Sequence, residues 1–327
     1  MNNRPTIGFA LSGGSSRAIA HIAVLEVMKE NDIPIDYLTG CSSGALVAVS
    51  FASGRMEYFK NWMHEHTLKS LIRMWTINFD RGALFDLGKG ELHLKEIIGD
   101  ISFETAHPKL GFVAADVNSG ELVTISMGDL FTAVRASFAV PGLFPPVIWG
   151  NKILVDGGLV NIVPTLPAKE MGADIVIGVN VSGAKFIYEK KLPYWRAYRY
   201  ITKILGIDYL TQAQTNLLHK LFSAVNSKEY DDTAIESPGI IRLLARALDR
   251  SMEVSDKWTD EHMACDLMIT PEVKQYRKTE MGNLESIYQE GRRAALAAVP
   301  QIKSLLAQHG SQSAPIKNKL KLHEFKR

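Results

Sequence analysis

Two strand-to-helix units follow one another at the start of the chain, and this order restricts the fold more than any other feature. Residues 7–11 form a short apolar run that is typical of a buried strand, and the glycine-containing turn 12–16 leads into a helical pattern over 17–30. A second strand is expected over 36–39, followed by an apolar helix over 45–52. Repeated strand–turn–helix units indicate an α/β fold with parallel strands.

Later segments extend this pattern and suggest one large domain. The further expected elements are a mostly helical region over 55–100, strands over 110–117, 121–126, 153–155, 174–181 and 265–270, and an amphipathic helix over 281–308. We expect a single domain over residues 1–309. Within it, 183–263 reads as a helical, lid-like insertion, and 310–327 as a flexible basic tail.

Composition excludes several classes of protein. The 327 residues are 46% hydrophobic and 22% charged, as in ordinary globular chains, and the net charge of +2 argues against a nucleic-acid partner. Two cysteines, Cys41 and Cys265, cannot form a disulfide framework. No run approaches the roughly 18 apolar residues of a membrane-spanning helix, and the first apolar run is too short for a signal peptide. A cytoplasmic protein is therefore expected, with membrane contact only at the surface.

The pentapeptide Gly40-Cys41-Ser42-Ser43-Gly44 lies between the second strand and its helix. Gly-x-Ser-x-Gly in this context is typical of a nucleophile elbow, in which the serine occupies a strained turn and the glycines allow close backbone contact. The following helix would direct its N–H groups toward the serine oxygen. Ser42 is thus the candidate nucleophile; the alternative is a serine that caps the helix.

A second polar turn, Gly13-Gly14-Ser15, separates the first strand from its helix. Its backbone N–H groups are candidates for an oxyanion hole or a phosphate site. The turn has neither the lysine of a Walker loop nor the glycine spacing of a dinucleotide-binding loop. By itself a structural turn explains it equally well.

Asp156 ends the apolar run 153–155 and is followed by Gly157 and Gly158. A carboxylate at a strand end, with glycines that permit close backbone approach, suits a base that faces the serine. The alternative for this tripeptide is a β-turn.

Taken together, the three motifs resemble those of the patatin-like phospholipase family, in the same order and with similar spacing. The segment 136–146, with the sequence ASFAVPGLFPP, resembles bacterial members as well. The resemblance implies a three-layer α/β/α fold with a mainly parallel sheet. It also implies a serine hydrolase that cleaves carboxylic esters of phospholipids, lysophospholipids or related lipids through a Ser42–Asp156 dyad and an acyl-enzyme, without a cofactor. Burial would raise the pKa of such an aspartate and make it a better base.

The glycine loop departs from the family pattern, Gly-Gly-Gly-x-Arg/Lys-Gly, at Ser15 and Ala18. Oxyanion donors are backbone N–H groups, so a serine can serve if its backbone angles are tolerated. A positive φ at Ser15 would cost on the order of 1 kcal/mol.

Six further side chains near the motifs have candidate roles. Arg17 is a candidate for binding a substrate phosphate, with a structural ion pair as the alternative. His21 is expected to be packed and hydrogen-bonded, and Cys41 to fill space behind the elbow. The candidates for an acyl pocket are Phe138, Leu143 and Phe144, with core packing as the alternative.

Three other interpretations stay open at this level. A conventional Ser–Asp–His esterase would need His219 or His262 as its third member, and a catalytically weak regulatory protein would keep the fold. The basic, aromatic stretch 190–203 suits a lipid surface or an oligomer interface. No metal site is expected, because the histidines are scattered and His64-x-His66 lacks further ligands.

Overall fold

The computed structural model describes residues 4–67, 85–182, 264–276 and 281–311, with positions 70, 74, 76, 77 and 83 between the first two ranges. The predicted insertion 183–263 and most of the predicted tail therefore lie outside the described residues. The last described helix continues to Ser311, one residue beyond the start that we expected for the tail.

The described chain begins with two strand-to-helix units, as the sequence predicts, and later strands also follow one another directly. The strands are β1 (Ile7–Leu11), β2 (Tyr37–Cys41), β3 (Thr76–Ile77), β4 (Phe85–Asp86), β5 (Lys109–Asp116), β6 (Leu122–Ile125), β7 (Val147–Trp149), β8 (Lys152–Asp156), β9 (Ile175–Val179) and β10 (Leu267–Ile269). The helices are η1 (Ser15–Ala18), α1 (Ile19–Glu30), α2 (Ser43–Ala52), α3 (Met56–Glu65), α5 (Gly90–Ile98), α6 (Leu130–Ser137), η2 (Gly157–Leu159), α7 (Thr165–Glu170) and α11 (Leu284–Ser311).

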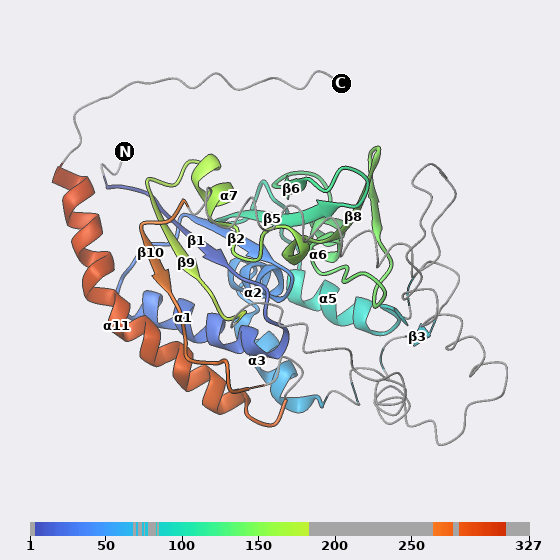
Figure 1. The fold of residues 1–327 in the computed structure, drawn as a ribbon. Coiled ribbons are helices and arrows are strands. Elements are labelled where there is room, and N and C mark those ends of the chain that lie inside the picture. Colours follow the sequence, from blue (N-terminus) through green and yellow to red (C-terminus); the bar gives the residue numbers. More distant parts are fainter. Residues whose placement is uncertain are drawn as a thin grey trace, which may run out of the picture.

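One sheet with the order β10-β9-β1-β2-β5-β8-β7 forms the centre of the molecule, and β6 pairs with β5. The pairs from β10 to β5 are parallel, whereas β6, β7 and β8 join by antiparallel pairing. Helices α1 and α11 lie together on one face of the sheet and α7 lies on the other (Figure 1). The three-layer α/β/α fold with a mainly parallel sheet is confirmed.

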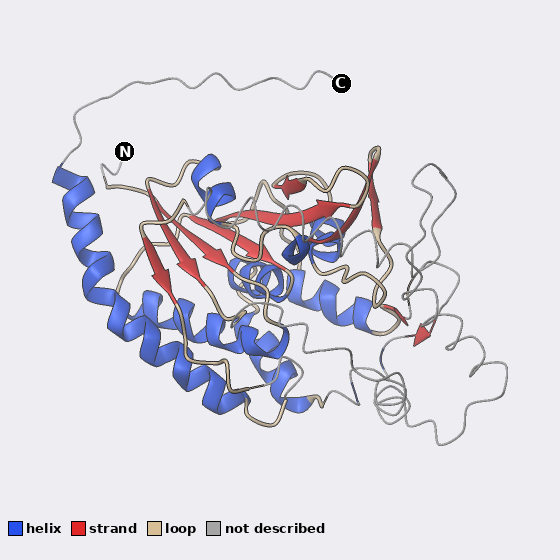
Figure 2. Cartoon of the chain, viewed as in Figure 1, coloured by secondary structure: helices blue, strands red, loops and turns tan. Residues whose placement is uncertain are grey.

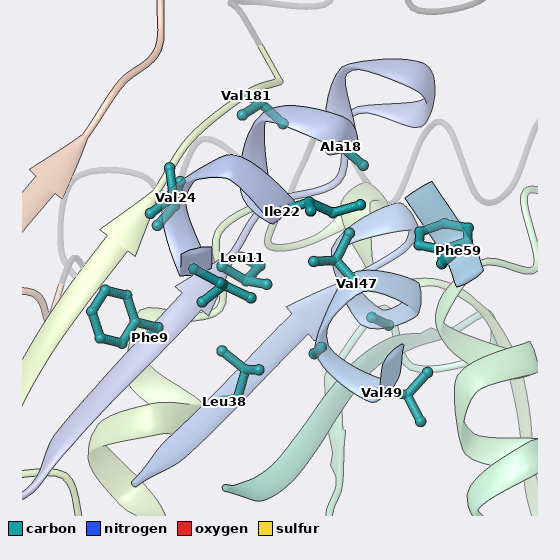
Figure 3. Close-up of a cluster of buried hydrophobic side chains, with 14 of the residues drawn as sticks. Phe9, Leu11, Ala18, Ile22, Val24, Leu38, Val47, Val49, Phe59 and Val181 are labelled. Atoms are coloured by element: carbon teal, nitrogen blue, oxygen red, sulfur yellow. The ribbon is translucent and has the colours of Figure 1, made fainter. Parts of the chain in front are cut away.

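The two faces of the sheet are packed differently because side chains alternate along each strand. Toward α1 and α2, the strands present large residues such as Phe9 and Leu11, which belong to the same hydrophobic cluster as Ile22 and Val47 (Figure 3). Toward α7, β1 presents Gly8, where an added Cβ would lie 2.8 Å from Ala173. The larger core therefore lies beneath α1 and α2, and α7 packs closely on small residues.

Two expectations from the sequence were incomplete. The helix expected from residue 17 begins as the short 3₁₀ turn η1 and becomes α-helical only at Ile19. The region expected to be mostly helical over 55–100 contains α3 and α5, but also the antiparallel pair β3–β4 (Figure 2). Among the described residues, no helix is both long and apolar enough to cross a membrane.

Candidate active site

Ser42 occupies a strained position between β2 and α2. Its backbone angles are φ 53° and ψ −122°, and only two other non-glycine residues in the described part of the chain, Ser15 and Asp32, have a positive φ. Such a conformation costs on the order of 1–3 kcal/mol and persists only where the surroundings impose it. A strained serine at a strand-to-helix turn is the geometry of a nucleophile elbow.

The two glycines of the elbow are required by close backbone packing. A Cβ added to Gly40 would lie 2.6 Å from backbone atoms of Ala45, so the turn closes tightly on itself. A Cβ added to Gly44 would lie 2.4 Å from the carbonyl oxygen of Leu11, so α2 begins in direct contact with the end of β1. The elbow and the glycine loop are thus packed against each other.

A buried serine from another element holds the strained residue. The backbone N–H of Ser42 donates to Oγ of Ser137, at 3.0 Å, and Ser137 is fully buried at the end of α6. This hydrogen bond joins the elbow to the segment 136–146, whose resemblance to bacterial family members we noted without assigning a role to the serine. The spacing of the two residues offers no sequence signal for their contact.

The strand that ends at Asp156 meets, end to end, the strand that Ser42 directly follows. Cys41 in β2 pairs with Val113 of β5, and Asp156 in β8 pairs with the next residue, Ala114. Because β6 pairs with these same two residues of β5, it occupies the opposite edge of β5. Strands β2 and β8 therefore share one edge of β5 and run toward each other, which brings Ser42 and Asp156 to the same junction.

Side-chain contacts at this junction agree with the pairing. The Sγ atom of Cys41 lies 3.8 Å from Oδ1 of Asp156, and the same oxygen accepts a hydrogen bond from the Gly158 N–H at 2.8 Å. Asp156 is only 6% exposed. A Cβ added to Gly157 would lie 2.5 Å from the carbonyl oxygen of Val113, so the Asp-Gly-Gly turn also requires close backbone packing. Cys41 fills the space behind the elbow and contacts the carboxylate as well.

The glycine loop lies beside Ser42, since a Cβ added to Gly13 would be 3.2 Å from the Cβ of Ser42. Its three candidate oxyanion donors differ in availability. The Gly13 N–H donates to the Ile162 carbonyl at 3.2 Å, and the Gly14 N–H donates to Oγ of Ser43 at 3.0 Å. Among the described residues, no acceptor is found for the Ser15 N–H.

Ser15 adopts φ 54°, the left-handed conformation that glycine tolerates best. The residue that replaces the third glycine of the family pattern is therefore strained, at a cost on the order of 1 kcal/mol. The backbone keeps the glycine-type conformation despite the substitution.

The remaining candidates have varied surroundings. The Phe138 and Phe144 rings contact each other edge to face, with centroids 5.7 Å apart, and Leu143 is 41% exposed. Arg17 is buried and donates to backbone carbonyls of residues 182, 274 and 276. His219, His262 and the basic stretch 190–203 lie outside the described residues.

His21 is fully buried, and its Nε2 contacts the Ser12 carbonyl oxygen at 2.9 Å. This contact agrees with the expected packed, hydrogen-bonded role. Burial lowers the pKa of His21 to about 4, and the hydrogen bond to Ser12 only partly opposes that effect. The side chain is therefore neutral in the folded protein at neutral pH.

We expect the pKa of His21 to make the fold sensitive to acid. Because the folded pKa of about 4 lies below the unfolded value of 6.5, the unfolded chain binds the proton more readily. Neutral His21 stabilises the fold above pH 6.5. As the pH falls toward 4, this contribution is lost, and the free energy of unfolding decreases by roughly 3 kcal/mol. Urea unfolding at pH 7 and pH 4.5 measures this loss, which His21→Gln should reduce.

The exposed residue His64 supplies the control, since His64→Gln should leave the pH dependence unchanged. An equal acid loss in wild type and His21→Gln would contradict the assignment.

A concavity of about 280 Å³ lies at the amino-terminal ends of β2 and β5, whereas Ser42 lies at the carboxyl end of β2. Tyr37, Lys109 and Met171 contribute to its lining. It is remote from the carboxyl end of β2, so it has no part in the candidate site. In the described ranges, no group of three or more His, Cys, Asp or Glu side chains is placed to hold a metal ion.

A three-layer α/β/α fold with a strained serine between a parallel strand and a helix is an arrangement of serine acyl hydrolases. Residues 9–169 match the family model described as patatin-like phospholipase. This part of the chain, residues 9–169, belongs to the patatin-like phospholipase family.

Curated relatives share this part of the chain. An uncharacterized NTE family protein of Mycobacterium tuberculosis (strain ATCC 25618 / H37Rv) is 29% identical over 184 residues, which cover 56% of this chain and 51% of the relative. A second such protein from the same strain is 33% identical over 171 residues, covering 52% of this chain and 28% of the relative. The lysophospholipase nte1 of Emericella nidulans is 23% identical over 324 residues, or 96% of this chain and 19% of the relative. The chain thus spans about half the length of the first relative and less of the other two.

Proposed function

We propose that this protein is a serine lipid-acyl hydrolase that cleaves carboxylic esters of phospholipids, lysophospholipids or related lipids. The observation that carries the proposal is the junction of β2 and β8. There Cys41, which directly precedes the strained Ser42, and the buried Asp156 pair with adjacent residues of β5. Membership of the patatin-like phospholipase family supports the same reaction class.

In the proposed reaction, Oγ of Ser42 attacks the ester carbonyl carbon while Asp156 accepts the hydroxyl proton. The carbonyl becomes a tetrahedral oxyanion, which collapses as the proton passes to the departing alcohol. A water molecule then attacks the acyl-enzyme and gives a proton to Asp156. The C–Oγ bond breaks as Asp156 returns that proton to Oγ of Ser42, which releases the fatty acid and restores the serine hydroxyl and the carboxylate. No cofactor is needed for either step.

The oxyanion is assigned to the backbone N–H groups of Gly13, Gly14 and Ser15, which lie next to the elbow. Ser15 is the leading donor, because its N–H has no acceptor among the described residues. Gly14 would have to exchange the hydroxyl of Ser43 for the oxyanion. The strain at Ser15 is consistent with a backbone held in position for this purpose.

Lysophospholipids are the first substrates to examine, because one relative is named a lysophospholipase. Phe138, Leu143 and Phe144 are proposed to contact the acyl chain. An ester of this kind is presented by a membrane or micelle, so peripheral contact with a lipid surface is part of the proposal, as is a cytoplasmic location. Homo-oligomerisation stays an open prediction.

The alternatives have different chemical consequences. A conventional triad would require His219 or His262, whereas a regulatory protein would have an unreactive serine. His21, the described histidine next to the glycine loop, contacts the Ser12 carbonyl and is not arranged as a third member.

A labelling and substrate experiment tests the proposed function. We expect purified wild-type protein to react with a fluorophosphonate probe at one site, Ser42, and to release fatty acid from a lysophospholipid. Mass spectrometry identifies the labelled peptide, and His219→Ala and His262→Ala should keep wild-type turnover. Absence of both labelling and ester hydrolysis would favour the regulatory alternative, and loss of turnover in either histidine variant would favour the triad.

A further inference from the structure

Arg17 is a buried charged residue that the proposed reaction does not use. It lies in η1, three residues after Gly14, and is only 6% exposed. Burial lowers the pKa of its guanidinium, but a guanidinium stays charged in proteins. A buried charge is costly unless hydrogen bonds replace its lost hydration.

Backbone carbonyl groups supply those hydrogen bonds. Nη1 donates to the Ser182 carbonyl at 2.7 Å, and Nε donates to the Tyr276 carbonyl at 2.9 Å. Nη2 donates to Tyr276 as well, at 2.5 Å, and to the Lys274 carbonyl at 3.3 Å. Ser182 follows β9, whereas Lys274 and Tyr276 follow β10, so one side chain joins the glycine loop to two separate segments.

The segment after β9 also contacts the glycine loop directly. The Val181 N–H donates to Oγ of Ser12 at 2.9 Å. A Cβ added to Gly14 would lie 2.7 Å from Cγ2 of Val181, so the loop packs tightly on this residue. The position of the loop therefore depends on segments held in place by Arg17.

We propose that Arg17 is a positioning residue for the oxyanion loop and that it does not bind a substrate phosphate. Its guanidinium is directed at three carbonyl groups behind the loop, which fixes the backbone of Gly13, Gly14 and Ser15 relative to Ser42. The fork of five N–H donors suits several carbonyls at once, and a lysine ammonium cannot reproduce it. The kinetic part of this inference rests on the proposed hydrolase function.

Arg17→Lys separates the two roles because it keeps the charge and removes the fork. Turnover is measured on a lysophospholipid and on a phosphate-free monoacylglycerol with the same acyl chain. A positioning role predicts that kcat falls on both substrates by the same factor, about 10-fold or more, with KM changed by less than about 2-fold. A loss confined to the lysophospholipid, or chiefly in its KM, would show that Arg17 binds phosphate and would overturn the proposal.

Two further measurements keep the test decisive. Rates are expressed per serine labelled by a fluorophosphonate, so a partly unfolded preparation still yields turnover per competent site; unchanged turnover on this basis also overturns the proposal. Hydrogen exchange of the peptide covering residues 12–18 is independent of catalysis, and Arg17→Lys should make its amides exchange faster.

The control is Arg293→Lys, an exposed position on α11 that should alter none of these readouts. A wild-type chain without hydrolysis would count against the proposed function, while the exchange result would still decide whether Arg17 holds the loop.

Discussion

Replacing Ser42 by alanine is expected to lower kcat for lipid ester hydrolysis by on the order of 10³- to 10⁶-fold. The variant lacks the atom that forms the acyl-enzyme, so only binding and oxyanion stabilisation can assist attack by water. It should also lose reaction with a fluorophosphonate. Steady-state kinetics and probe labelling of the purified variant measure both effects.

Asp156→Asn is expected to produce a similar loss, on the order of 10³-fold or more, because an amide cannot accept the proton of Ser42. The amide is nearly isosteric with the carboxylate, so the Gly158 N–H keeps an oxygen acceptor and the turn should persist. Near-UV circular dichroism checks that the fold is retained in both variants.

Ser304→Ala is a suitable control, since this serine is exposed on α11 and far from the elbow in sequence. It should keep wild-type turnover. Retention of more than a tenth of wild-type activity by Ser42→Ala or Asp156→Asn would refute the dyad.

Gly44→Ala is expected to destabilise the fold by about 3–5 kcal/mol or to prevent folding. The new Cβ would lie 2.4 Å from the Leu11 carbonyl oxygen and 2.6 Å from that of Ser12, and both contacts are with backbone. Backbone cannot move aside as a flexible side chain can, so β1 and α2 must separate. Urea unfolding monitored by circular dichroism gives the free energy.

Gly282→Ala provides the matched comparison, because no atom of the described residues lies within 4 Å of the Cβ that would be added there. This substitution should change the free energy of unfolding by less than about 0.5 kcal/mol. Equal stabilities for the two variants would show that the elbow does not need the close contact of Gly44.

Much of the fold follows from local sequence. The run at residues 7–11 forms β1 with the same bounds, because five consecutive buried residues suit a strand covered on both faces. Asp129 accepts a hydrogen bond from the Thr132 N–H and caps α6, a signal that was present in the sequence although we predicted no helix there. The short edge strand β7 was missed because it follows two prolines and leaves Ile148 exposed.

The parts of the site differ in how predictable they were. Ser42, Asp156 and the glycine loop are marked by glycines whose missing side chains permit backbone contact. The antiparallel direction of β8 has no such mark, because apolar content does not specify a partner strand. The contacts of Ser42 with Ser137 and of Gly13 with Ile162 join residues that are distant in sequence, so no local sequence pattern predicts them.

The meeting of β2 and β8 has a consequence for how variation in chain length is tolerated. Two neighbouring residues of β5, Val113 and Ala114, determine how far apart the serine and the carboxylate are held. Loops between the two strands can gain or lose residues without altering that separation. A slip of β8 along β5 by a single residue would instead bring Val155 opposite Ala114 and turn the acid toward the other face of the sheet.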